Sequence, residues 1–146
     1  MPQDSQSRGF REVEHTADKA AEAWAATLPE LFVAAAEAMF SASADLANIE
    51  RTQEWTVTVG ADSPEDLLHA WLSELLWLSD RDQAVPCAFE IEELDEQRWH
   101  LEAKAWGGPA PQDEPHTGAP VKAVTYHDLS IWRDDSVWKA HVVFDV

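Results

Sequence analysis

The chain has 146 residues and carries 28 Asp and Glu against 10 Lys and Arg, a formal net charge of -18. This length fits one domain that can bury a hydrophobic core. The negative charge argues against independent binding to a nucleic acid backbone, because phosphate binding requires clustered cations. One cysteine allows no disulfide within the chain, and no apolar run approaches the roughly 20 residues that span a bilayer. Since the first residues also show no targeting leader, we expect a cytoplasmic protein without a membrane anchor or direct nucleic acid contact.

The first residues are polar and show no hydrophobic pattern. Residues 1–9 are therefore predicted to be a disordered leader, and residues 10–146 to be a single domain. The domain is expected to open with a strand that ends at a turn beginning at Glu14. We see no internal repeat in the remaining sequence.

An amphipathic helix is predicted over residues 27–46. Thr27 with Glu30 three positions later is typical of a capping box, in which a side chain and the backbone satisfy each other's open hydrogen bonds. Pro29 falls in the first turn, where proline is tolerated. Apolar side chains recur at helical spacing: Leu28, Leu31, Phe32, Ala35, Met39 and Phe40.

A half-exposed strand is predicted next, over residues 54–61, because Trp55, Val57 and Val59 alternate with polar residues. A second amphipathic helix is expected over residues 63–82. Ser63 is a suitable cap, and the acidic residues that follow complement the positive end of the helix dipole. One broad apolar face is formed by Leu68, Trp71, Leu72, Leu75 and Leu78.

The remainder of the chain has the alternating pattern of strands. A turn is expected at 95–97, a loop at 107–120 and a turn at 133–135. The predicted fold class is therefore α+β, a single domain with two amphipathic helices packed on a mixed, mainly antiparallel β-sheet. The predicted strands cover 87–94, 98–106, 120–132 and 136–146.

Two internal clusters of polar residues are candidates for function. EHTAD, residues 14–18, has the alternative interpretation of a turn whose Thr and Asp bond to the local backbone. In VKAVTYH, strand alternation would put Lys122 and Tyr126 on one face and His127 on the other. The alternative is a lysine at a sheet edge and a structural histidine.

The third candidate is the pair formed by the Asp145 side chain and the Val146 carboxylate. Two adjacent carboxylates repel each other unless a cation or several donors compensate. Hard divalent ions prefer carboxylate oxygens, so Ca²⁺ or Mg²⁺ could bind here if a third anionic ligand came from elsewhere in the fold. The alternative is that both groups lie in water.

No nucleophile motif is present. Cys87 has no recognisable partner, and G-x-S-x-G, Walker and H-E-x-x-H patterns are missing. No catalytic nucleophile is therefore indicated by these motifs.

Taken together and in order, five stretches resemble the archease family. They are FREVEHTAD, LPELFVAAAEAMF, EDLLHAWLSELLWL, VKAVTYHDL and WKAHVVFDV, and they cover nearly all of the chain from Phe10 to Val146. The resemblance implies a non-enzymatic cofactor of the RtcB-type RNA ligase of tRNA splicing and RNA repair. Such a protein promotes GTP-dependent guanylylation of the ligase and its multiple turnover.

On this resemblance we predict no catalytic residue and a protein that is not an enzyme. One alternative is a small metal-dependent phosphoester hydrolase, with Asp18 and Asp145 holding the ion and His15 or His127 as general base. The other is a chaperone-like module that protects the ligase.

The resemblance also implies a metal site. In the family a divalent metal, most often Ca²⁺, with Mg²⁺ or Mn²⁺ as alternatives, is held by residues that correspond to Asp18, Asp145 and Val146. Lys122 corresponds to the family's KAVTYH lysine and is a second functional position. His15 and His127 complete the candidate partner or functional residues. The chain departs from the family pattern at three places: Lys19-Ala20, Gly107-Gly108 and His116.

Overall fold

The structure is a computed structural model that describes residues 8–13, 19–110 and 120–146. Predictions for residues 1–7, 14–18 and 111–119 lie outside these residues. The helices are α1 (Leu28–Ser41), a 3-10 turn η2 (Leu46–Asn48) and α2 (Pro64–Asp82). The strands are β1 (Gly9–Val13), β2 (Lys19–Ala25), β3 (Gln53–Gly60), β4 (Val85–Asp95), β5 (His100–Gly108), β6 (Ala123–Val124), β7 (Ser130–Asp134) and β8 (Val137–Asp145).

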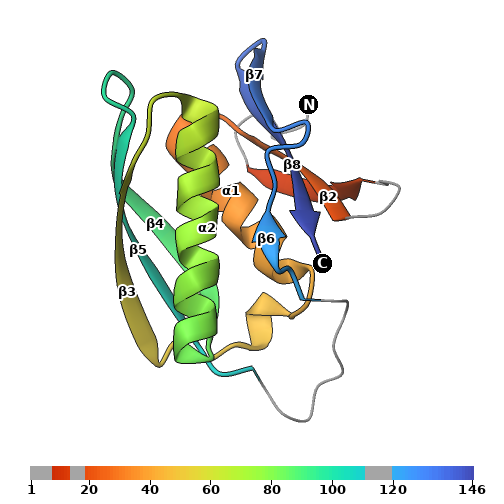
Figure 1. Ribbon diagram of the computed structural model, residues 1–146, viewed down its shortest axis with the longest axis vertical. Coiled ribbons are helices and arrows are strands. Elements are labelled where there is room, and N and C mark those ends of the chain that lie inside the picture. The colour runs from red at the N-terminus through yellow and green to blue at the C-terminus, as the bar shows by residue number, and fades with distance from the viewer. Residues whose placement is uncertain (1–7, 14–18, 111–119) are drawn as a thin grey trace.

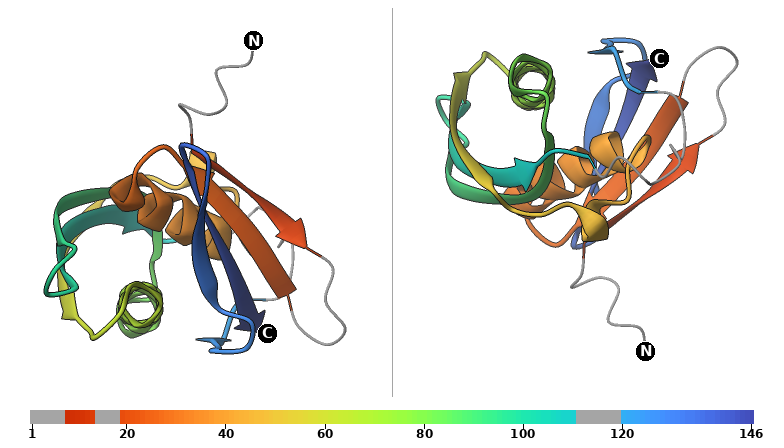
Figure 2. Two further views of the ribbon diagram at one scale, coloured as in Figure 1. Left: turned by 90° about the horizontal axis from the view of Figure 1, so that it is seen from above. Right: turned by 90° about the horizontal axis from the view of Figure 1, so that it is seen from below.

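The strands form two antiparallel sheets rather than one. The larger sheet has the order β1-β2-β8-β6, with β7 also paired to β8, and the smaller has the order β3-β5-β4. Helix α1 lies between the two sheets and contacts β2 and β4, while α2 packs on β3 and β6 (Figures 1 and 2). The predicted α+β class, with two helices on mainly antiparallel strands, is confirmed.

Both helices begin at the predicted caps. The Thr27 hydroxyl accepts a hydrogen bond from the Glu30 amide at 3.3 Å, and the Ser63 hydroxyl accepts one from the Asp66 amide at 3.1 Å. Helix α1 is buried on nearly all sides because both sheets cover it, whereas α2 buries a single stripe. No helix within the described residues is long and apolar enough to cross a membrane.

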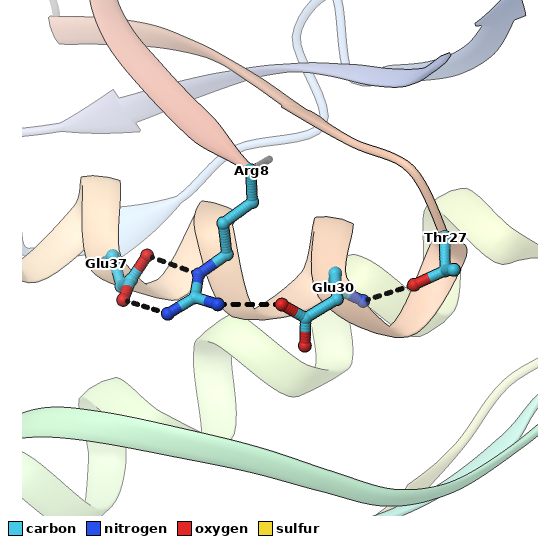
Figure 3. Close-up of polar contacts among 4 residues, drawn as sticks. All are labelled: Arg8, Thr27, Glu30 and Glu37. Carbon is cyan, nitrogen blue, oxygen red and sulfur yellow. Dashed lines mark hydrogen bonds and ion pairs between the residues drawn. The ribbon is translucent and has the colours of Figure 1, made fainter. Parts of the chain in front are cut away.

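Arg8 fixes the start of the domain on α1. Its guanidinium donates to both carboxylate oxygens of Glu37 at 3.0 Å and to Glu30 at 2.7 Å (Figure 3). The hydrogen bond to Glu37 is the main cause that raises the pKa of Arg8 above its usual value. Gly9 is the first residue of β1, so the ordered strand begins one residue before the predicted domain boundary, and the division into leader and domain stays a prediction.

Strand β2 was not predicted. Its sequence KAAEAWA is rich in alanine, which has low strand propensity. It lies between β1 and β8, pairing with β8 along its whole length and with β1 from Ala20 to Trp24. Small side chains suit this central position, since Ala21, Ala23 and Ala25 are buried in the core that α1 shares with this sheet.

The predicted single strand over 120–132 is also wrong. It is divided into β6 and β7 by a turn in which the Leu129 amide donates to the Tyr126 carbonyl at 3.3 Å. Asp128 in this turn has a φ of 54°, a left-handed conformation that aspartate tolerates better than most residues. Lys122 and Tyr126 therefore do not alternate within one strand as expected.

A carboxylate near the end of α2 carries a pH prediction. Arg81 donates to both oxygens of Asp82 at 2.8 and 2.9 Å, and the Trp55 indole donates at 2.7 Å. The Arg81 hydrogen bond, followed by that from Trp55, lowers the pKa of Asp82 to about 2. A carboxyl group whose pKa is lower in the folded than in the unfolded protein stabilises the fold. Here the contribution is fully present above the unfolded pKa of about 3.9, and it is lost as the pH falls through the folded pKa of about 2.

We expect Arg81→Ala to raise the pKa of Asp82, because its strongest hydrogen-bond donor is removed. Carboxyl carbon chemical shifts followed by NMR between pH 1 and pH 6 measure this directly. Asp95 is the internal control, since the pKa of its carboxyl is lowered by the amides of Arg98 and Gln97. An Asp82 titration that does not move in the variant would contradict the assigned cause.

Candidate functional site

Three strands meet around Asp145, the last residue of β8. On one side β2 pairs with β8 so that Lys19 lies opposite Phe144. On the other side β6 pairs with β8 so that Ala123 lies opposite Asp145. Figure 1 shows the end of β8 beside β6 at the point where the chain stops. The segment that follows EHTAD and the segment VKAVTYH therefore flank the same strand end.

The main chain joins Lys122 to Asp145. The Lys122 amide donates to the Asp145 carbonyl oxygen at 2.7 Å, and three residues later Thr125 donates its amide and hydroxyl to the Val143 carbonyl, each at 3.0 Å. The side chains of Lys122 and Asp145 are exposed, and Val146 is half-buried. The structure thus brings Lys122, Asp145 and Val146 together and leaves the Asp145 carboxylate open to solvent.

Asp18 and His15 lie outside the described residues. The next residue, Lys19, is described, and its Nζ donates to the Ala42 carbonyl at 3.4 Å and lies 4.0 Å from Glu12 Oε2. Ala42 caps the C-terminal end of α1, where a cation is favoured by the helix dipole. The lysine that departs from the family pattern therefore has its own role at the helix end.

His127 lies in the turn after β6. Its Nε2 is 3.3 Å from Asp128 Oδ2, and its amide donates to the Thr125 hydroxyl at 3.2 Å. Both the His127 and Asp128 side chains are more than half exposed. The contacts of His127 therefore tie it to the turn rather than to Asp145.

The metal ligand set has only two of its three members in the described part of the chain. Across residues 8–13, 19–110 and 120–146, no group of three or more His, Cys, Asp or Glu is arranged to hold a metal ion. The predicted set includes Asp18, which is outside these ranges. The prediction of a divalent metal at Asp18, Asp145 and Val146 stays a prediction.

Sequence reasoning missed His69, which joins α2 to this region. Its Nε2 lies 2.9 Å from the Val124 carbonyl oxygen, and its ring stacks on Tyr126 with centroids 3.9 Å apart and planes at 8°. The position of β6 against α2 depends on this contact. Nothing in the helical pattern around His69 indicates it, because its partners are more than 50 residues away in sequence.

The glycine pair that departs from the family pattern has a packing role. A Cβ at Gly107 would overlap the Val85 carbonyl oxygen and lie 2.8 Å from Pro86 Cα. A Cβ at Gly108 would overlap the Glu50 carbonyl oxygen and lie 2.7 Å from Thr52 Oγ1. Neighbouring backbone approaches both residues too closely for a larger side chain.

The chain is similar to proteins of one family over almost its entire length. The Archease protein family (MTH1598/TM1083) matches residues 10–146. Protein archease of Methanopyrus kandleri is 36% identical over 138 residues, covering 94% of this chain and 99% of that protein. Protein archease of Pyrococcus furiosus is 34% identical over 141 residues, covering 95% of this chain and 99% of that protein.

Solved structures have the same fold. The solution structure of Methanobacterium thermoautotrophicum protein 1598 matches with a TM-score of 0.76 and 30% identity over 94% of this chain and 99% of that one. The crystal structure of a Thermotoga maritima archease, described as a possible chaperone, matches with a TM-score of 0.64 and 26% identity over 93% of this chain and 96% of that one. Sequence and fold agree, and this chain belongs to the archease family.

Proposed function

We propose that this protein is a non-enzymatic activator of an RtcB-type RNA ligase. It promotes GTP-dependent guanylylation of the ligase and its multiple turnover in tRNA splicing and RNA repair. The observation that supports the proposal is that VKAVTYH and the terminal motif meet at one strand end, where the Lys122 amide donates to the Asp145 carbonyl oxygen and Lys19 lies opposite Phe144. Family membership supports it independently.

The charge of the protein supports a basic protein partner. The net charge is -18, and a ligase that binds RNA presents a basic surface. Opposite net charges steer two proteins together and raise their association rate. This steering acts in the cytoplasm, where we place the protein, and it involves no nucleic acid contact by the activator itself.

A divalent cation, most simply Ca²⁺, is part of the proposal. Asp18, Asp145 and Val146 would hold it, and oxygen donors of this kind fit a hard cation. The two described members of the set are consistent with this, because the Asp145 carboxylate is exposed while the Lys122 amide bonds to its backbone carbonyl. The ion would hold this acidic strand end in place at the surface that meets the ligase.

The metal proposal predicts the effect of neutralising both aspartates. In the double variant Asp18→Asn with Asp145→Asn, we expect Ca²⁺ affinity to fall by about 100-fold, because ligand charge sets the affinity of calcium sites. Isothermal titration calorimetry measures this. The rate at which the ligase is labelled by radioactive GTP should then return to its value without activator.

A control variant with the same change in net charge separates the effect of losing the metal ligands from the effect of losing two negative charges. Asp62→Asn with Asp135→Asn alters two exposed aspartates in loops away from β8's last residue. This variant should bind Ca²⁺ and activate the ligase like the wild-type protein. Full ligase activation by the Asp18 and Asp145 double variant would show that the metal is not needed.

The same assays distinguish the two alternatives. A metal-dependent hydrolase would turn over a phosphoester with no ligase present. A chaperone-like module, the description given to the Thermotoga maritima relative, would protect the ligase in stoichiometric amounts. It would leave the guanylylation rate of already folded ligase unchanged.

A further inference from the structure

An open groove lies between α2 and the segment that leads into β6. Its volume is about 670 Å³. One wall is the exposed face of α2, with Ser73, Trp77 and Asp80, and the other is formed by residues 120–124. Figure 1 shows α2 and β6 side by side along this line. The groove is therefore on the outer surface of the domain, where a partner can reach it.

Two aromatic side chains stand at this groove. Trp77 lines it and is 57% exposed, and Tyr126 is 63% exposed and stacks on His69, which also lines it. Tryptophan and tyrosine are enriched at protein interfaces, because each combines a large apolar ring with a polar group. Since His69 is bonded to the Val124 carbonyl oxygen, the Tyr126 ring has a fixed support on one face.

The chemistry of the groove favours a cation. The Cζ atom of Arg81 lies 5.0 Å from the centroid of the Trp77 ring, so this ring already accepts a guanidinium. Among the side chains that line the groove, Asp80 is acidic and Lys122 is basic, while helix α2 as a whole carries one arginine against five carboxylates. The five are Glu65, Asp66, Glu74, Asp80 and Asp82.

The groove continues into the candidate site. Lys122 lines the groove, and its amide is the donor that holds the Asp145 carbonyl oxygen. A protein that covers Asp145 would therefore also meet the wall of the groove at Lys122 and Ala123. The groove and the candidate site at Asp145 therefore form one continuous surface, on the side of β8 that pairs with β6.

We propose that this groove is a docking surface for a basic, arginine-bearing surface of the RNA ligase. Partner guanidinium groups stack on Trp77 and Tyr126 and pair with Asp80, while the ligase reaches Asp145 at the adjoining site. The inference rests on the proposed function, because it takes the ligase as the partner. It adds where the ligase binds and through which side chains.

Binding of the purified full-length protein to its cognate RtcB-type ligase tests the proposal. In the double variant Trp77→Ala with Tyr126→Ala, the Kd should rise by about tenfold or more, because exposed aromatic anchors dominate binding at interfaces. The control is Trp132→Ala, which removes another exposed tryptophan, on β7 and not in the groove. Its Kd should equal that of the wild-type protein, and thermal unfolding should show that all variants are folded.

The outcomes separate this proposal from the proposed function. If the double variant binds the ligase as tightly as the wild-type protein, and the wild-type protein still accelerates guanylylation, the docking proposal is wrong and the proposed function stands. If the wild-type protein neither binds nor activates the ligase, both are wrong. If sedimentation shows that the double variant loses only a self-association of this chain, the occupant is a second copy and the proposal is overturned.

Discussion

The variant Trp71→Ala is expected to lose about 4 kcal/mol of unfolding free energy, within the range for a fully buried aromatic residue. Trp71 lies on α2 with 0% of its surface exposed. Its indole donates to the Phe32 carbonyl oxygen on α1 at 3.0 Å, and its ring meets the edge of Phe89 on β4 with centroids 6.2 Å apart. The residue thus joins both helices to the smaller sheet.

Urea unfolding followed by circular dichroism measures this loss. The control is Trp77→Ala on the same helix, because Trp77 is 57% exposed and its removal leaves no cavity. We expect that control to stay within about 0.5 kcal/mol of the wild-type protein. Similar losses for the two variants would contradict the placement of Trp71 at the junction.

Replacing Gly107 with alanine is the second change with a large expected effect. We expect a loss of about 3 kcal/mol, the upper end of what an overpacked site costs, because the new Cβ would overlap the Val85 carbonyl oxygen and approach Pro86 Cα. Both obstacles are backbone atoms of β4, the strand that pairs with β5 here. They can yield only if the two strands move apart.

Gly60→Ala is the matched control, since Gly60 is also a strand glycine. Its Cβ would meet His100 Cδ2 at 3.6 Å and the Trp99 carbonyl oxygen at 3.9 Å, which are ordinary contacts. We expect a change within about 1 kcal/mol, with a stabilising contribution from the less flexible unfolded chain. Urea unfolding of both variants gives the comparison, and equal stability of the two would contradict close packing at Gly107.

The helices could be predicted from sequence because their determinants are local. Thr27 and Ser63 cap helices through amides three residues away, and the apolar spacing of α2 defines the stripe that is buried. Strand β3 was predicted for the same reason, since Trp55 and Val57 are buried and alternate with exposed residues. In each case the residues that decide the structure are neighbours in the chain.

The two errors in the larger sheet have a non-local cause. The alanines of β2 carry no strand signal, and their strand forms because β1 and β8 pair with it on both sides. In the segment after Pro120 the strand-like alternation of side chains in the sequence continues through a turn, so the sequence predicted one strand where there are two. The break depends on Asp128 in a left-handed conformation and on α2, which holds Val124 through His69.

The candidate site was predicted in part. The sequence indicated Asp145 and Lys122 through separate motifs, and the pairing of β6 with β8 brings them into hydrogen-bond contact. His127, by contrast, is tied to Asp128 within its turn. The contact of His69 with β6 could not be predicted, because it depends on how α2 lies across the end of the larger sheet.

Multiple-turnover RNA ligation by the cognate RtcB-type ligase is the most direct test of whether this protein activates the ligase. Guanylylation from GTP and ligated RNA are followed with and without this protein, at a small fraction of the ligase concentration. We expect faster guanylylation and many ligation events per ligase at these substoichiometric amounts. Ligation that stops at the same yield with and without the protein would contradict the claim that this archease is a recycling activator.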